Sequence, residues 1–289
     1  MIPITGHTRL TALLGSPVAH SISPLMHNEA FQLLDLDYTY LCFEVNEETL
    51  PAAVDGLKAC GIRGFNLTMP NKNKIVELLD ELSPAARLIG AVNTVVNDDG
   101  HLTGYNTDGG GYMQAVKDAG YDITGKTITI MGAGGAATAI CAQAALDGVE
   151  KIHIFARETS RFWDRTQKLA ENINSTLPCK AVLHENKDTA ALAQAISESA
   201  LLLNATSVGM APNTEGTIIE DTSLYHPDLI VSDVIYNPRE TRFLKEAREA
   251  GCRTFNGMYM LLYQGAEAFR LWTGKEMPVK EIKAKFFAD

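Results

Sequence analysis

Short apolar runs alternate with segments of helical period along almost the whole chain. The runs are rich in residues that favour strands, and the segments between them place apolar residues three and four apart, as an amphipathic helix does. Parallel strands need a long crossover connection, so this alternation is typical of a mostly parallel sheet with helices packed on it. The pattern therefore predicts an α/β fold.

The first part of the chain carries its own set of these elements. The predicted strands are Leu10–Leu14, Tyr38–Val45, Gly64–Thr68, Val92–Asn97 and a short piece near Leu102. The predicted helices are Pro24–Leu34, Glu48–Ala59 and Lys74–Leu79. The run Asp98-Asp99-Gly100 is a predicted turn.

In the second part, predicted strands and helices alternate as one continuous βαβ series, which is typical of a doubly wound Rossmann domain. A boundary near Gly109–Gly111 precedes a predicted crossing helix, Tyr112–Ala119. The predicted strands that follow are Thr127–Met131, Lys151–Phe155, Lys180–Leu183, Leu201–Asn204 and Ile230–Asp233. The predicted helices are Gly135–Leu146, Trp163–Asn174 and Thr189–Glu198, and then Met258–Leu271 and Pro278–Phe286 at the end.

Composition narrows the functional classes. A chain of 289 residues, 46% hydrophobic and 21% charged, is long enough for two globular domains. The net charge of −10 and the scattered basic residues disfavour nucleic acid as a partner. Five widely spaced cysteines suggest neither a disulfide framework nor a zinc site. The first residues lack the layout of a signal peptide, so we expect a cytoplasmic protein.

One uncharged stretch of nearly membrane-spanning length contains a glycine-rich motif. The stretch is Ile128–Leu146, and within it the run Gly132-Ala133-Gly134-Gly135-Ala136 joins a predicted strand to a predicted helix. Glycines let the backbone turn tightly and approach a pyrophosphate, whose charge is held by free N–H groups at the helix start. The alternative is a glycine turn that serves only close helix packing. The strand, turn and helix context favours a dinucleotide site.

The next strand ends before Ala156-Arg157-Glu158, where such domains bind the adenosine ribose. Glu158 could accept hydrogen bonds from both ribose hydroxyls, and Arg157 could stack on adenine or meet a 2′-phosphate. A solvated charge pair at a strand end is the alternative for these residues.

The first domain presents polar side chains at strand ends and loops. Ser21 and Ser23 would point the same way from an extended loop and offer hydroxyls to a carboxylate. Ser23 before Pro24 could also cap a helix, and the two roles are compatible. Asn66 and Thr68 alternate with apolar residues, so a strand places both on one side, and Lys72 follows at its carboxyl end. A lysine at such a place is more often a solvated surface charge.

Asn93 and Asp108 stand in two further short motifs. The motifs are Gly-Ala-Val-Asn-Thr (90–94) and Tyr-Asn-Thr-Asp-Gly (105–109). Without other evidence, the favoured interpretation of Asp108 is that it caps the N-terminus of the following helix.

Eight motifs in order and spacing resemble the shikimate dehydrogenase family. They are Ser-Pro-Val-Ala-His-Ser-Ile-Ser-Pro (16–24), Asn-Leu-Thr-Met-Pro-Asn-Lys (66–72), the two motifs around Asn93 and Asp108, Gly-Ala-Gly-Gly-Ala (132–136), Asn-Ala-Thr-Ser-Val-Gly-Met (204–210), Tyr-Asn-Pro (236–238) and Met-Leu-Leu-Tyr-Gln-Gly-Ala (260–266). Longer stretches such as Leu-Trp-Thr-Gly-Lys (271–275) are similar to the dual-specificity quinate/shikimate branch.

The resemblance implies a role for each matching residue. It makes Lys72 the acid/base residue and Asp108 its partner, and it implies an NAD(P)-dependent shikimate or quinate/shikimate dehydrogenase. Residues implied to meet the substrate are Ser21, Ser23 and Tyr236 at the carboxylate, and Asn66, Thr68, Asn93, Asp108 and Gln264 at ring hydroxyls. Residues implied to contact the dinucleotide are Gly132, Ala133, Gly134, Gly135, Ala136, Ala156, Arg157, Glu158, Thr206, Ser207, Val234, Gly257 and Met260.

The resemblance also implies the domain roles and the partners. Residues 1–110, joined by 257–289, would bind substrate, and residues 111–256 would bind NAD(P). The chain departs from the common NADP-type run Asn-Arg-Thr at 156–158, so NAD is the expected coenzyme and NADP the second candidate. The expected partner is shikimate, with quinate as a further substrate; a metal, nucleic acid or a membrane is not expected, and a homodimer stays open. A non-catalytic dinucleotide or shikimate sensor and an amino-shikimate-type dehydrogenase are the alternatives.

Overall fold

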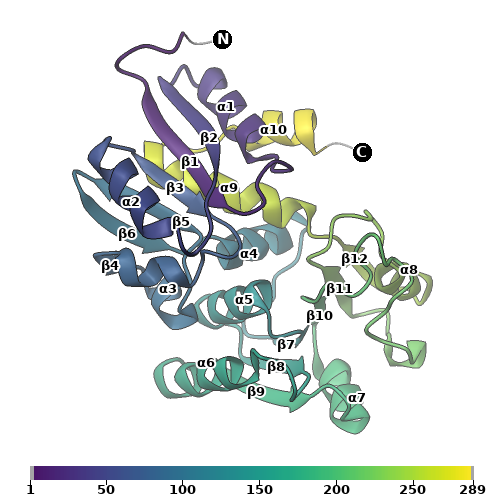
Figure 1. Cartoon of the computed structure of the whole chain (residues 1–289). Coiled ribbons are helices and arrows are strands. Elements are labelled where there is room, and N and C mark those ends of the chain that lie inside the picture. The colour runs from purple at the N-terminus through teal and green to yellow at the C-terminus, as the bar shows by residue number, and fades with distance from the viewer. Residues whose placement is uncertain (1–2, 288–289) are drawn as a thin grey trace. The chain divides into compact units, whose positions relative to one another are not determined.

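The computed structural model describes residues 3–287 and divides them into two compact units (Figure 1). The first unit runs to Gly111 and resumes at Leu262, and the second is Tyr112–Leu261. Both boundaries fall inside helices, α4 (Asp108–Asp118) and α9 (Met258–Thr273).

The first unit contains a mixed six-stranded sheet of order β2-β1-β3-β5-β6-β4. The strands are β1 Arg9–Gly15, β2 Tyr38–Glu44, β3 Gly64–Leu67, β4 Glu81–Leu82, β5 Thr94–Asp98 and β6 His101–Tyr105. Strand β1 pairs in parallel with β2 and β3, whereas β5 is antiparallel to both β3 and β6. The predicted turn joins β5 to β6: Asp99 and Gly100 have φ of 51° and 93°, as tight hairpin turns require.

The helices of this unit cover the sheet with apolar side chains. They are α1 Ser23–Leu33, α2 Leu50–Ala59, the 3₁₀ helix η1 Lys74–Leu78, α3 Pro84–Ile89, the end of α9, and α10 Val279–Phe286. Leu50 and Val54 of α2 pack on Leu14 of β1 and Phe65 of β3. Trp272 of α9 donates its indole N–H to the Val95 carbonyl at 2.9 Å.

The second unit is a six-stranded parallel sheet of order β12-β11-β10-β7-β8-β9. The order reverses between β7 and β10, as in dinucleotide-binding domains. Its strands are β7 Thr127–Met131, β8 Lys151–Ala156, β9 Lys180–Glu185, β10 Leu201–Asn204, β11 Ile230–Asp233 and β12 Arg253–Phe255. Its helices are α5 Gly135–Leu146, α6 Trp163–Thr176, α7 Thr189–Glu198, the 3₁₀ helix η2 Thr222–Leu224, and α8 Arg242–Glu249.

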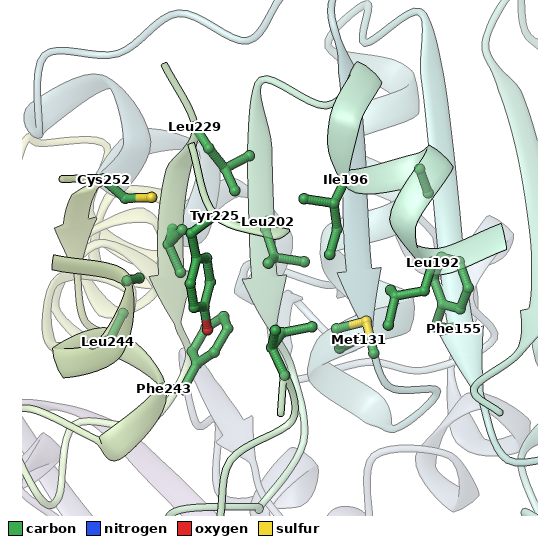
Figure 2. Close-up of a cluster of buried hydrophobic side chains, with 14 residues drawn as sticks. Met131, Phe155, Leu192, Ile196, Leu202, Tyr225, Leu229, Phe243, Leu244 and Cys252 are labelled. Atoms are coloured by element: carbon green, nitrogen blue, oxygen red, sulfur yellow. The ribbon is translucent and has the colours of Figure 1, made fainter. Parts of the chain in front are cut away.

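One apolar layer joins the two later helices of this unit to the sheet (Figure 2). Leu192 and Ile196 of α7 lie on one side of Leu202 of β10, and Phe243 and Leu244 of α8 lie on the other. This layer supports the carboxyl ends of β10 and β11, where polar residues follow.

The sequence-based elements agree with the structure in most places. Segment 74–78 is a 3₁₀ helix, so the predicted helix there has the wrong type. The expected mostly parallel sheet is mixed in the first unit because β3, β5 and β6 pair antiparallel. The pattern missed α3, α8, β4, β12 and the 3₁₀ helix η2, which are short elements of at most eight residues. Among the described residues, no helix has the length and apolarity that crossing a membrane requires.

A buried histidine lies in the aromatic core of the first unit. His27 of α1 stacks on Tyr40, with ring centroids 4.5 Å apart, and lies 5.3 Å from Trp272. Neither of its ring nitrogens has a hydrogen-bond partner among the described residues. Burial lowers the pKa of His27 to about 3. The folded protein therefore holds this imidazole neutral.

We expect His27 to make the fold sensitive to acid. Below pH 6.5 this histidine binds a proton in the unfolded chain but stays neutral in the folded chain. The free energy of unfolding therefore decreases as the pH falls. Between pH 6.5 and 4 this linkage amounts to about 3 kcal/mol. Urea unfolding of wild type and His27→Leu should show that the wild type loses about this much more over that interval. The exposed His7→Leu should follow wild type, and parallel curves for all three proteins would disprove the assignment.

Candidate active site

A lysine and an aspartate form a close pair in the first unit. Lys72 lies in the loop after β3, and Asp108 is the first residue of α4. The Lys72 Nζ lies 2.6 Å from the Asp108 Oδ2, and their side chains are 30% and 14% exposed. The pair is therefore shielded but still open to a small molecule.

Asn93 holds the other oxygen of this aspartate. Its Nδ2 donates to the Asp108 Oδ1 at 2.9 Å, while its Oδ1 accepts the backbone N–H of Thr107 at 2.8 Å. A backbone N–H can only donate, so the amide orientation of Asn93 is fixed. The carboxylate of Asp108 thus faces Lys72 and Asn93, and the N–H of Asp108 is bonded instead by the Asn106 side chain.

Asn66 continues the network beneath the pair. Its Nδ2 donates to the Asn93 carbonyl at 3.1 Å and to the Thr94 hydroxyl at 2.9 Å. Its Oδ1 accepts the Tyr40 hydroxyl at 2.8 Å. Both amide hydrogens are occupied, so Asn66 can offer a ligand only the remaining lone pair of Oδ1.

The serine loop reaches the same network. Ser23 is the first residue of α1, whose N-cap is Ile22 and which has no side-chain cap, so the capping role predicted for Ser23 is wrong. Burial raises the pKa of Tyr40, and a hydrogen bond with the Ser23 side chain opposes that rise. Ser21 accepts the N–H of Ser23 at 3.2 Å. The structure thus links Ser23 through Tyr40 to Asn66.

Two other predicted substrate residues lie in this unit. Thr68 follows β3 and is half-buried. Gln264 lies on α9, against the start of α4: a Cβ on Gly111 would lie 2.5 Å from the backbone N of Gln264, so only glycine permits this approach. Tyr236 belongs to the second unit, where its side chain is 45% exposed.

The glycine turn of the second unit leaves the start of α5 open. Gly132 has φ of 124°, and a Cβ there would lie 2.7 Å from the Ala205 carbonyl oxygen. Gly134 is the N-cap of α5 and provides no side-chain cap. The first N–H groups of α5 therefore have no side-chain acceptor, as a pyrophosphate site requires.

A cleft of about 1460 Å³ in the second unit follows this turn. The predicted coenzyme residues that line it are Gly132, Ala133, Gly134, Ala156, Arg157, Thr206 and Ser207. Those outside its lining are Gly135, Ala136, Glu158, Val234, Gly257 and Met260. Gly257 instead packs on the backbone of Val234, where no Cβ would fit. The glycine turn and the cleft fit a dinucleotide.

The loop after β8 is held at the end of β9. The N–H of Glu158 donates to the Glu185 carboxylate, and the N–H of Asn186 donates to the Ala156 carbonyl at 2.9 Å. Sequence reasoning missed several residues that line the cleft here, among them Arg161 and Lys187. Their signal was weak, because exposed basic residues are common on any surface.

Sequence reasoning also missed a buried pair at the ends of β10 and β11. Asn204 donates to both carboxylate oxygens of Asp233, at 3.2 and 3.1 Å, and its Oδ1 accepts the Thr206 N–H at 3.0 Å. Burial raises the pKa of Asp233 to about 6, against hydrogen bonds that lower it. An aspartate after an apolar strand is typical of the start of a turn, so no distinct sequence signal marks Asp233.

Comparison with known proteins agrees with both units. Residues 13–95 match the shikimate dehydrogenase substrate binding domain, and residues 257–285 match the shikimate 5′-dehydrogenase C-terminal domain. The chain is 55% identical over 284 residues to a Listeria monocytogenes protein named shikimate dehydrogenase (NADP(+)), covering 98% of this chain and 97% of the relative. It is 45% identical over 280 residues to an Escherichia coli quinate/shikimate dehydrogenase, covering 97% of each.

A solved structure extends this agreement to the fold. Shikimate 5-dehydrogenase from Listeria monocytogenes, in complex with shikimate and NAD, is 56% identical, covers 97% of each chain and superposes with a TM-score of 0.95. These matches extend over nearly the whole chain, and they confirm the α/β fold with a substrate-binding and a Rossmann domain. The chain belongs to the shikimate dehydrogenase family.

Proposed function

We propose that this chain is an NAD(P)-dependent oxidoreductase that interconverts shikimate and 3-dehydroshikimate. The observation that carries the proposal is the pair of Lys72 Nζ and Asp108 Oδ2, 2.6 Å apart and held by Asn93. When bound, the nicotinamide supplies the hydride acceptor or donor. The protein's own task is then to bind the ring and to move one proton.

Lys72 is the residue proposed to move that proton. Its amino group takes the proton of the C3 hydroxyl when the alcohol is oxidised and returns it when the ketone is reduced. General acid/base help of this kind is worth roughly a hundred- to ten-thousand-fold in rate. Asp108 orients the amino group, and Asn93 orients Asp108, so the base is positioned before substrate arrives.

Further residues are proposed to bind the rest of the ring. Those assigned to the substrate carboxylate are Ser21, Ser23 and Tyr236, and those assigned to ring hydroxyls are Asn66, Thr68, Asn93, Asp108 and Gln264. The links from Ser23 through Tyr40 to Asn66 support a common site for the first-unit residues. Residues 1–110 with 257–289 are accordingly the proposed substrate domain, and residues 111–256 the coenzyme domain.

Coenzyme and substrate range follow from the same residues. We propose that NAD serves at least as well as NADP, because Glu158 and Glu185 place two carboxylates at the loop after β8. Arg157, Arg161 and Lys187 in the cleft keep NADP usable. Quinate is the proposed second substrate, in line with the 45% identity to the quinate/shikimate relative.

Replacing the base is the direct test of the mechanism. We expect Lys72→Ala to lower kcat for shikimate oxidation at least a hundredfold, with little change in coenzyme affinity, since the dinucleotide cleft is left intact. Lys74→Ala removes a neighbouring lysine that pairs with Glu77 at 2.7 Å and serves as the control. Steady-state rates that cross shikimate and quinate with NAD and NADP would give the substrate range. Near wild-type turnover by Lys72→Ala would refute the mechanism, and binding without turnover in wild type would favour a sensor.

Coenzyme choice gives a second test. We expect Glu158→Gln to shift the ratio of kcat/KM about fivefold toward NADP, because one carboxylate no longer repels the 2′-phosphate. The exposed Glu171→Gln on α6 changes net charge equally and should leave the ratio as it is. If wild type strongly prefers NADP and Glu158→Gln keeps that preference unchanged, Glu158 does not contribute to coenzyme choice.

A further inference from the structure

Asp233 is a buried carboxylate that the proposed mechanism does not use. It is the last residue of β11 and has no exposed surface. Its oxygens accept the N–H of Ile235 at 2.9 Å, the Thr241 hydroxyl at 2.8 Å and the Asn204 amide at 3.2 and 3.1 Å. All of these donors are neutral, so hydrogen bonds stabilise the carboxylate without cancelling its charge.

The charge itself persists at the pH of an assay. Burial raises the pKa of Asp233 to about 6, so the carboxyl is ionised at pH 8. A neighbouring pair, the hydroxyls of Tyr112 and Ser232, is also uncharged. Burial raises the pKa of Tyr112, and the Asp233 charge adds to that rise. Burying an unpaired carboxylate costs free energy, which points to a use for the charge.

The position of Asp233 indicates which part of the coenzyme would feel this charge. Asp233 and Asn204 end β11 and β10, and Asn204 accepts both the N–H and the hydroxyl of Thr206, at 3.0 and 2.7 Å. Thr206 lines the cleft. In a sheet of this order one half binds adenosine and the other half binds the second mononucleotide. The loop after β8 belongs to the adenosine half, so β10 and β11 belong to the nicotinamide half.

We propose that Asp233 is a fixed buried anion that favours the oxidised, positively charged nicotinamide ring over the reduced, neutral ring. This inference rests on the proposed function, since it requires that a nicotinamide coenzyme occupies the cleft. The two phosphates of the coenzyme carry the same charge in both redox forms, so they do not affect the comparison. A negative charge in a low-dielectric interior acts over several ångströms and is poorly screened by salt.

Coenzyme binding in the absence of substrate tests the inference. Calorimetry at pH 8 would measure the Kd of oxidised NAD and of NADH for wild type and Asp233→Asn. Asparagine keeps the size and can still accept from Asn204, so the expected result is about tenfold weaker binding of oxidised NAD with NADH changed less than twofold. The shift should persist in 0.5 M salt. Asp233→Ser offers a smaller neutral side chain if the asparagine variant fails to fold.

Thr241→Val is the matched control, because it removes one hydrogen bond to Asp233 and keeps the charge. It should lower Tm and leave the ratio of the two Kd values at the wild-type value. Equal weakening of both redox forms in Asp233→Asn would mean that the carboxylate only shapes the loop, and would overturn the inference. Shikimate turnover by wild type tests the proposed function separately, and failure of wild type to bind either redox form would overturn both.

Discussion

Three buried asparagines organise the polar groups at the ends of the strands, and each has its amide orientation fixed by a backbone group. Asn66 donates to the carbonyl of Asn93, Asn93 accepts the N–H of Thr107, and Asn204 accepts the N–H of Thr206. A backbone carbonyl cannot donate and a backbone N–H cannot accept, so none of the three amides can flip without leaving a buried group unpaired. That constraint determines which polar atom each amide presents to its neighbours.

The fixed asparagine amides orient different groups in the two units. In the first unit, the fixed amide of Asn93 sets the Asp108 carboxylate, and Asp108 in turn holds Lys72. In the second unit, the fixed amide of Asn204 joins Asp233 to Thr206, which lines the cleft beside the glycine turn. Both arrangements are complete before any ligand binds, so little reorganisation is needed at the moment of reaction.

Most of the fold, but only part of the candidate site, could be predicted from the sequence. Helices Gly135–Leu146 and Thr189–Glu198 follow directly from their local pattern. The antiparallel position of β5 depends on pairing with β3, a contact between distant segments that no local pattern encodes. Lys72 and Asp108 lie 36 residues apart, so their pairing could be inferred only from a family resemblance. Asp233 left no sequence signal because its role depends on complete burial, which appears only in the folded chain.

Asn66 is proposed to bind a ring hydroxyl, and its occupied amide hydrogens would make that contact selective for the direction of the hydrogen bond. The Asn66 Oδ1 can accept a hydrogen bond from a ligand hydroxyl, which has a hydrogen to donate. It would repel a ligand group that has only lone pairs. Fluorine and methoxy substituents are similar in size to hydroxyl or extend it modestly, yet both would set one acceptor against another in a poorly hydrated place. Inhibitor design against this site is therefore constrained more by the direction of one hydrogen bond than by the volume available.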